Sequence, residues 1–429
     1  RVLFRSLCLI IIFCISAALR PLAAQPYTLD DCRRIALEKN AQLQEMKIGE
    51  QTSRHMKKQA LTYFFPNISA FGMGFKATDP MVSIDLGMLG SMAMLQDGVL
   101  ISAMAVQPVF MGGKVFYSTK LADIGIRASE LFTVQKKEEI LVQTGEYFWL
   151  LYSLYEKRNT VSAMQQALDS LYKDVQQAQK AGILGQNEVL KVKLQKNTLS
   201  TRNVELENGI YLATMALARQ MGLPVDSLEG FVIDPPAELH ISDPGEYYVE
   251  PASVLSGRTE YQLLEIGVRA AELEKKIETA SYMPQVGVGA LYYYENLLDK
   301  NNWNGALMAT FRVPISDWFR GSFAIRQKKL EETKAQIRKE DGRQQLLMQI
   351  RQAWGSFVES YQKYLLAELS VEESLENTRL NEEYFRAGTV SLTELLAARG
   401  FLQESYDKKT DAIRDYQLAR SLYLQVTGR

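Results

Sequence analysis

The chain has 429 residues, and its 49 basic and 50 acidic side chains leave a net charge of −1. A charge so close to neutral gives no basic field of the kind that binds nucleic acid. The two histidines, His55 and His240, lie far apart in different contexts, so a histidine-based triad or zinc site has almost nothing to draw on. The sequence therefore predicts neither an enzyme nor a cofactor.

Residues 1–24 are predicted to be a signal peptide. Arg1 and Arg5 precede an apolar run from Leu7 to Leu19, and small residues follow it. The run has 13 residues, which is short for a bilayer-spanning helix; the alternative is a retained anchor. No transmembrane helix is predicted after it. Cys32 is the single cysteine beyond the signal, which excludes a disulfide within the mature chain.

The segment 25–222 is predicted to form a helix, a β-hairpin within 64–110, a very long helix and a returning helix. Asn67–Phe75 and Val99–Gln107 alternate apolar with other residues, as strands do, although not cleanly. No proline interrupts Gly113–Lys180, so a continuous helix of roughly 100 Å is expected there.

A glycine-centred break ends each long helix, at Gly182 and at Gly388. Glycine just past a helix is the usual left-handed stop, and it lets the next helix run back. Glu188 and Glu394 follow in the first turn of each returning helix, where a carboxylate suits the positive helix end. Ser391 with Glu394 fits a capping box. We expect capping to be the main stabilising role of both glutamates, which is compatible with a second role at a pore mouth.

Residues 223–251 are predicted to be the connector, because the helical pattern lapses there and five of the 12 prolines gather in it. The segment 252–429 is expected to contain a helix, a β-hairpin within 283–314, a long helix and a returning helix. Its alternating segments, Pro284–Tyr294 and Trp303–Val313, match the length of about 9 to 11 residues that a tilted membrane strand needs. A soluble hairpin with one wet face gives the same alternation.

Both long helices carry a seam of mostly apolar residues at steps of three and four, which is typical of coiled coils. In the second half the seam consists of Leu347, Ile350, Trp354, Phe357, Tyr361 and Leu365. In the first half it consists of Leu141, Thr144, Phe148, Leu151 and Tyr155.

The two halves are predicted to be an internal repeat. Three landmarks recur at a spacing of 206 positions: Pro108, Gly182 and Gly222 return as Pro314, Gly388 and Gly428. Upstream landmarks recur at 218 positions: Asn40 and Pro66 return as Arg258 and Pro284. The first half thus has 12 extra residues in its hairpin region. The Met- and Gly-rich segment 78–98 holds them and is predicted to be a long external loop or an extension of the hairpin.

Four strands in one chain cannot close a membrane barrel, and lipid does not tolerate an open sheet edge. If these strands span a membrane, several chains must therefore pool them. Two chains would give eight strands and three would give twelve, and periodicity alone does not choose between them.

Short motifs in a fixed order give the chain a specific resemblance. They are Tyr27-Thr28-Leu29, Ala36-Leu37-Glu38-Lys39-Asn40, Gln107-Pro108-Val109-Phe110, Tyr282-Met283-Pro284-Gln285, Val313-Pro314-Ile315, both glycine breaks and Val426-Thr427-Gly428. Their order, duplication and spacing resemble the TolC family of outer-membrane efflux and secretion channels. The resemblance covers nearly all of the mature chain.

The resemblance implies an α+β membrane protein that assembles as a homotrimer. A 12-stranded β-barrel in the outer membrane, with four strands from each chain, is continued by a long α-helical barrel in the periplasm. The implied partners are a periplasmic adaptor protein and an inner-membrane pump of the RND or ABC type, which hand substrates to the channel.

The resemblance also assigns roles to the two helical tips. Glu188 and Glu394 match acidic positions at the periplasmic entrance, and Asn187 matches a polar neighbour of the gate. The adaptor-docking turns correspond to Gly182, Ile183, Leu184, Gly388, Thr389 and Val390. Three chains would bring three copies of each glutamate near the axis, which predicts a cation-favouring constriction.

Three positions depart from some members of that family. Ala397 stands in place of a second acidic residue, Val390 in place of a gate arginine, and Phe385 in place of a gate tyrosine. The salt-bridged latch of those members is therefore not expected here, and closure of the entrance must rest on other contacts.

The function predicted from these features is the outer-membrane exit duct of a tripartite efflux or type I secretion system, which exports substrates passively. The alternative is a periplasmic coiled-coil adaptor or structural stalk. That alternative uses the seams and turns but leaves the duplicated alternating segments without a purpose.

Overall fold

The computed structural model describes residues 26–85, 87, 91–94, 96–226, 228, 230–236, 239–296, 301–315 and 318–429. The predicted signal peptide lies outside them. The chain divides into two compact units, and each contains segments from both halves of the sequence. The sheet unit comprises Glu45–Gln135 and Ser256–Leu346. The helical unit comprises the chain up to Gln44, Lys136–Leu255 and Leu347–Arg429.

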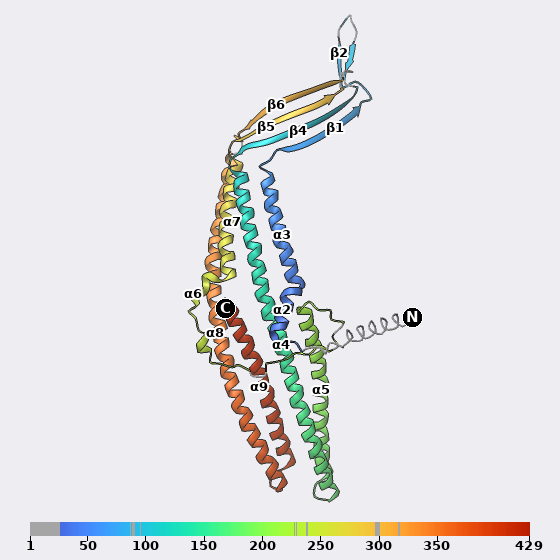
Figure 1. Ribbon diagram of the computed structural model, residues 1–429, viewed down its shortest axis with the longest axis vertical. Helices are drawn as coiled ribbons and strands as arrows, with labels where there is room; N and C mark the ends of the chain where they lie inside the picture. The colour runs from blue at the N-terminus through green and yellow to red at the C-terminus, as the bar shows by residue number, and fades with distance from the viewer. Residues whose placement is uncertain are drawn as a thin grey trace, which may run out of the picture. The chain divides into compact units, whose positions relative to one another are not determined.

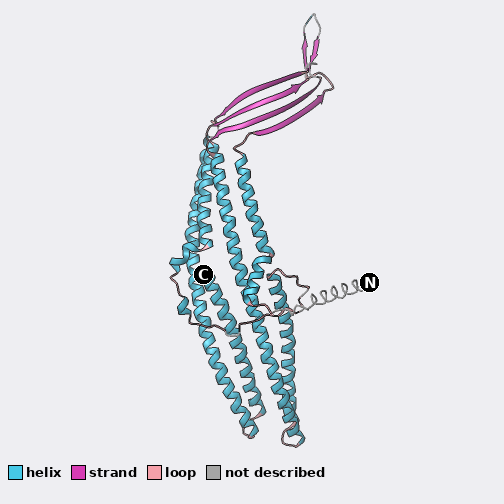
Figure 2. Cartoon of the chain, viewed as in Figure 1, coloured by secondary structure: helices cyan, strands magenta, loops and turns pink. Residues whose placement is uncertain are grey.

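The sheet unit joins a four-stranded antiparallel sheet to helices. Its strands are β1 (Asn67–Lys76), β4 (Asp97–Met111), β5 (Gln285–Glu295) and β6 (Asn302–Arg312), in the order β1-β4-β5-β6. Its helices are α3 (Ala41–Thr62), α7 (Thr259–Ser281) and the first parts of α4 (Lys114–Lys180) and α8 (Trp318–Arg386), as Figure 1 shows. The four strands predicted from alternation are confirmed (Figure 2).

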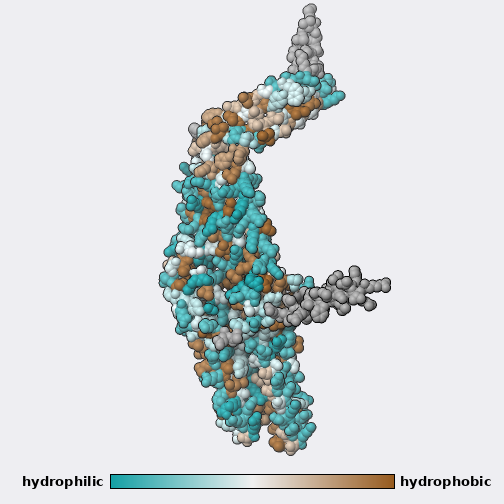
Figure 3. Space-filling model, in the orientation of Figure 1, coloured by the Kyte–Doolittle hydropathy of each residue, from teal (hydrophilic) through white to brown (hydrophobic). Residues whose placement is uncertain are grey.

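The sheet has one apolar face over β5 and β6. The pairs Val286–Phe311, Ala290–Leu307 and Tyr294–Trp303 lie directly opposite each other across the two strands, on the same face. Polar residues and glycines dominate the other face: Gln285, Gly287, Gly289, Asn302, Asn304, Thr310 and Arg312. Leu307 is 90% exposed on the apolar face, so that face is not covered within the chain (Figure 3).

The segment 78–98 contains a second, small hairpin. β2 (Val82–Asp85) and β3 (Ser91–Met94) form a separate two-stranded antiparallel sheet. The region with the 12 surplus residues therefore contains β-structure of its own, separate from the four-stranded sheet.

The helical unit contains two long hairpins and the connector. It holds α2 (Leu29–Lys39), α5 (Gln186–Gln220), α9 (Leu392–Val426) and the remaining parts of α4 and α8. Three short elements lie along the connector and just after it: η2 (Pro244–Tyr247), α6 (Pro251–Val254) and η3 (Leu255–Gly257). The continuous first-half helix expected from the missing prolines is confirmed, because α4 runs for 67 residues; α8 runs for 69.

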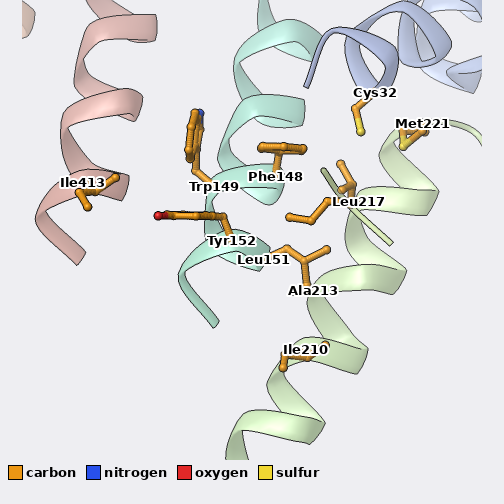
Figure 4. Packing of buried hydrophobic residues seen from close by; sticks show 11 residues of the cluster. Cys32, Phe148, Trp149, Leu151, Tyr152, Ile210, Ala213, Leu217, Met221 and Ile413 are labelled. Atoms are coloured by element: carbon orange, nitrogen blue, oxygen red, sulfur yellow. The ribbon is translucent and has the colours of Figure 1, made fainter. Parts of the chain in front are cut away.

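Apolar seams form the cores of this unit. In the first half, Phe148 and Leu151 of α4 are fully buried against Leu217 of α5, with Cys32 of α2 beside them (Figure 4). In the second half, Ile350 and Phe357 of α8 pack with Tyr416 and Tyr423 of α9. The predicted seams are thus confirmed at their centres. Leu365 is the exception, because it is 46% exposed.

Two buried tyrosines of α9 hold the connector. The hydroxyl of Tyr416 donates to the carbonyl oxygen of Ser242 at 2.7 Å and accepts the N–H of the same residue at 3.0 Å. The hydroxyl of Tyr423 accepts the N–H of Val249 at 3.1 Å. Both rings are fully buried, so these bonds fix otherwise irregular backbone to the second hairpin.

Candidate functional site

The tips of the two helical hairpins have matching turn geometry. Gly182 follows α4 with φ of +74°, and Gly388 follows α8 with φ of +75°. The N–H of Ile183 donates to the Ala178 carbonyl at 2.9 Å, and that of Thr389 donates to Tyr384 at 3.0 Å. These are the left-handed helix stops expected from the sequence.

Glu394 forms the capping box that the sequence predicts. Ser391 is the N-cap of α9, and its hydroxyl accepts the N–H of Glu394 at 3.3 Å. The Glu394 carboxylate in turn accepts the backbone N–H of Ser391 at 2.8 Å and its hydroxyl at 2.9 Å. These hydrogen bonds lower the pKa of Glu394, which remains exposed and charged at neutral pH.

Glu188 does not cap its helix, so that expectation is wrong for the first tip. The N-cap of α5 is Gly185, which makes no side-chain cap bond. The Glu188 carboxylate instead pairs with Lys191 one turn later, at 2.9 Å. Glycine has no side chain with which to form a capping box, and the nearby lysine attracts the carboxylate.

Lys191 also connects the two tips, and this contact was not predicted from the sequence. Its Nζ donates to the hydroxyl of Thr393 in α9 at 2.9 Å. The spacing of three residues between Glu188 and Lys191 was a readable signal for the ion pair. The partner across the tips was not readable, because it depends on how the hairpins pack.

A shared apolar cluster holds the tips together; we call it the tip cluster. Leu392 and Leu395 of α9 are buried with Val189 and Val192 of α5 and with residues of α4. Leu184 and Phe385 pack against it partly buried. Phe385 thus makes an apolar contact where some family members have a gate tyrosine.

The remaining predicted tip residues are mostly on the surface. Asn187 is exposed and Val390 is half-buried. Ile183 is 76% exposed at the end of the first hairpin. Thr389 is also exposed, and its hydroxyl donates to the Tyr384 carbonyl at 3.1 Å. The two turns therefore present different side chains, one apolar and one polar, on equivalent backbones.

Arg399 is a second cross-hairpin contact that the sequence did not reveal. It donates through Nε and Nη2 to Glu382 of α8, at 3.1 Å and 2.7 Å. Its Nη1 donates to the Ala167 carbonyl of α4 at 3.1 Å. One arginine thus links α9 to both long helices. Ala397, which stands where some members of the resembled family have a second acidic residue, is exposed.

Exposed aromatic and aliphatic residues also collect where the helices meet the sheet. Tyr63 and Phe65 lie between α3 and β1, and Phe319 and Phe323 lie in the first turns of α8. Phe319 is 85% exposed. Phe311 on β6 is 72% exposed as well, and exposed aromatic side chains of this kind are unfavourable in water.

No described helix has an apolar stretch of the length that a bilayer crossing requires. Within the same residues, no group of three or more His, Cys, Asp or Glu side chains is placed to hold a metal ion.

Comparison with known proteins adds a family and a fold. Residues 252–427 match the family model described as outer membrane efflux protein. None of the curated protein sequences matches the chain. The CmeC outer membrane channel of Campylobacter jejuni is similar in structure, with a TM-score of 0.82, 14% identity, and coverage of 93% of this chain and 85% of that chain.

Two further channels have the same fold. VceC of Vibrio cholerae has a TM-score of 0.78 and 16% identity, with 93% of this chain and 96% of that chain covered. The open state of the MtrE outer membrane channel of Neisseria gonorrhoeae has a TM-score of 0.75 and 16% identity, with 93% of this chain and 88% of that chain covered. The resemblance predicted from the sequence is confirmed by the match of residues 252–427 and by the fold, and the proteins of similar structure are channels. Residues 252–427 therefore match the model of the outer membrane efflux protein family, and the fold, over 93% of the chain, is similar to that of outer-membrane channels.

Proposed function

We propose that this chain is the outer-membrane exit duct of a tripartite efflux or type I secretion system. A periplasmic adaptor and an inner-membrane pump of the RND or ABC type deliver the substrate, and the duct releases it without chemistry. The main observation that supports this proposal is the exposed sheet. Its β5–β6 half has one apolar face, and its edge strands are β1 and β6. Exposure of Leu307 and Phe311 to water is unfavourable, whereas contact of these side chains with lipid is favourable.

The sheet edges argue for assembly. Edge strands present unpaired backbone N–H and C=O groups, which hydrocarbon does not satisfy. Pairing β1 of one copy with β6 of the next removes the edges only when the ring closes. Three copies give twelve strands, a size that leaves an open channel, and the long helices would then form a helical barrel around the same axis.

The chain organisation that fits this assembly is a pair of repeats, 25–222 and 252–429, joined by the connector 223–251. Each repeat contributes one β-hairpin and one helical hairpin. Three chains then place six near-equivalent helical tips around one axis, with two alternating kinds of turn for an adaptor to contact.

The tips are proposed as the periplasmic entrance. Gly182, Ile183 and Leu184 form one docking turn, and Gly388, Thr389 and Val390 form the other. Glu188, Glu394 and Asn187 line the mouth. Because Lys191 neutralises Glu188, cation preference rests mainly on the exposed Glu394. The tip cluster and the Lys191–Thr393 bond take the place of a salt-bridged latch.

Planar bilayers test the duct directly. Purified protein should insert and give stepwise conductance, since a closed ring of strands leaves a water-filled lumen. Persistent absence of conductance, with the protein recovered from the soluble periplasmic fraction, would instead support the coiled-coil adaptor or stalk.

The gate assignment has its own test. Glu394→Gln should lower the cation preference of the conductance more than Glu188→Gln does, because Glu188 is already paired. An unchanged preference in the double variant would leave capping and ion pairing as the whole role of these residues.

A further inference from the structure

Exposed, uncharged side chains form a row along α5, which we call the outer stripe of α5. Its positions follow each other at steps of four and three residues, so they share one face of the helix. None of them is charged, although the same stretch of α5 contains four basic and two acidic residues. Val204 is 69% exposed, and an exposed row with this spacing and without charge is typical of a helix that packs on another helix. The stripe consists of Leu190, Leu194, Asn197, Thr201, Val204, Asn208 and Tyr211.

The outer stripe of α5 lies on the side of the helix that faces away from the tip cluster. Val192 and Leu199 are buried in that cluster, and the helical repeat places them opposite the stripe. In the helical unit, α4 and α9 lie between α5 and α8 (Figure 1). Arg399 of α9 supports this order, because it donates to Glu382 of α8 and to the Ala167 carbonyl of α4. α5 and α8 are therefore the two edge helices of this unit.

α8 has an outer stripe of its own at the other edge. Its positions are all exposed, and they lie on the side of the helix opposite the buried Ser360 and Ala367. The part far from the tip is apolar. The part near the tip is acidic overall, because three glutamates stand beside one arginine, Arg379, which pairs with Glu376 and Glu383. The stripe consists of Leu365, Leu369, Glu372, Glu376, Arg379 and Glu383.

The two outer stripes match in their distance from the tips, which the hydrogen bond from α5 to α9 holds together. At about 1.5 Å per residue, Val204 is about 27 Å from the first residue of α5, and Leu369 is about 26 Å from the last residue of α8. Nearer the tips, the exposed Lys193 beside the stripe of α5 is about 10 Å from the same end, and Glu376 is about 15 Å from it. Apolar residues thus lie level with apolar residues, and a lysine lies level with the acidic part.

We propose that the outer stripe of α5 in one copy packs on the outer stripe of α8 in the next copy of this chain. Rotation about an axis along the helices brings one edge of each helical unit to the opposite edge of its neighbour and leaves all heights unchanged. α5 and α8 run in opposite directions, so the pair is antiparallel, with Val204 against Leu369 and Asn208 against Leu365. Lys193 then faces the acidic part of α8. This inference rests on the three-copy assembly of the proposed function, and it adds the pair of helices and their register.

Cross-linking of the full-length protein in detergent tests the register. Val204→Cys combined with Leu369→Cys should give covalently linked dimers and trimers on a denaturing gel after treatment with a short bis-maleimide, whereas each single variant should not. Cys32 is buried, so the native thiol should contribute little. Ser162→Cys combined with Leu369→Cys is the matched control, because Ser162 is exposed at the same height on α4. Asn208→Cys combined with Leu365→Cys tests the same register if the first pair disturbs folding.

Thiol accessibility in the intact assembly gives a second readout. A water-soluble maleimide should label Val204→Cys roughly tenfold more slowly than Ser200→Cys, because an interface core excludes water. Ser200 is exposed on the same helix and lies outside the outer stripe. After denaturation the two variants should react at the same rate.

Three outcomes would overturn the proposal. A trimer mass by native mass spectrometry without specific cross-linking of either pair would reject this interface and leave the assembly and the duct unaffected. Equally fast labelling of Val204→Cys and Ser200→Cys in the intact trimer would show that the outer stripe of α5 is open to another partner, such as an adaptor helix. A single-chain mass would contradict both the assembly and the interface.

Discussion

The returning helices α5 and α9 begin at turns of the same backbone geometry, yet their equivalent glutamates make different contacts. Glu394 caps its own helix through Ser391, whereas Glu188 turns to Lys191 because Gly185 offers no side chain. Two positions differ between the tips: the N-cap is Gly185 or Ser391, and the residue three positions after the glutamate is Lys191 or Ala397. Glu394 therefore has a capping partner and no lysine in the next turn, whereas Glu188 has the reverse. The difference teaches that a repeated position need not have a repeated role.

The same contrast continues along the two helices. At the positions of Ile210 and Leu217 in α5, α9 carries Tyr416 and Tyr423. Both pairs are buried in the cores of their hairpins, but the tyrosines also hold the connector through their hydroxyls. The second hairpin thus binds the connector through side-chain hydroxyls, whereas Ile233 of the connector is buried in the core of the first hairpin.

The largest effect should come from the tip cluster. Leu395→Ala removes a fully buried side chain and should lower the free energy of local opening at the tips by about 3 kcal/mol. Its repeat partner Val189→Ala removes fewer methyl groups and should cost roughly 1.5 kcal/mol. Hydrogen exchange followed by mass spectrometry measures both. Because both hairpins contribute to the tip cluster, each variant should increase hydrogen exchange at both tips. Increased exchange at one tip alone would contradict a shared cluster.

A somewhat smaller effect is expected at the connector. Tyr416→Phe leaves the N–H and carbonyl of Ser242 without a partner, which should cost about 2 kcal/mol and raise exchange across residues 239–250. Tyr364→Phe is the control, because its hydroxyl donates to the exposed Glu368. Equal exchange in the two variants would show that the hydroxyl bonds of Tyr416 do not hold the connector.

The capping difference predicts a pH-dependent effect at one tip. Ser391→Ala should destabilise the start of α9 by about 1 kcal/mol at neutral pH, while Gly185→Ser should stabilise α5 by a few tenths. Since Ser391 lowers the pKa of Glu394 below its unfolded value near about 4.3, this stabilisation is complete above that pH and is lost as pH falls through the folded pKa. The difference in stability of the first turn of α9 between wild type and Ser391→Ala should therefore become smaller in acid. Hydrogen exchange at two pH values measures this difference. A difference that does not change with pH would show that the Glu394 carboxylate is not its cause.

The smallest change in stability is expected for Lys191→Gln. The pair with Glu188 is partly exposed, so its loss should cost less than about 1 kcal/mol. The electrical effect should be clearer, because an unpaired Glu188 adds negative charge and raises the cation preference in planar bilayers. Lys196→Gln removes the same charge from the pair with Asp169 and serves as the control. An equal cation preference in the Lys191→Gln and Lys196→Gln variants would show that Lys191 does not act at the gate.

Periodicity and turn residues were enough to predict most of the local structure. Alternation of apolar residues predicted the four strands, and the absence of proline predicted α4. The glycines just after the two long helices predicted both turns. The predicted cap at Glu188 failed because it was inferred from its partner Glu394, although Gly185 differs from Ser391. The tip cluster, the Lys191–Thr393 bond and Arg399 join residues that are distant in sequence, and no local pattern specifies such packing.

The central claim is that three copies close one sheet and one helical barrel. Native mass spectrometry of the detergent-purified protein tests it most directly. We predict an assembly of three times the mass of the chain, stable while the detergent micelle is intact. A mass corresponding to one or two chains under the same conditions would contradict the account.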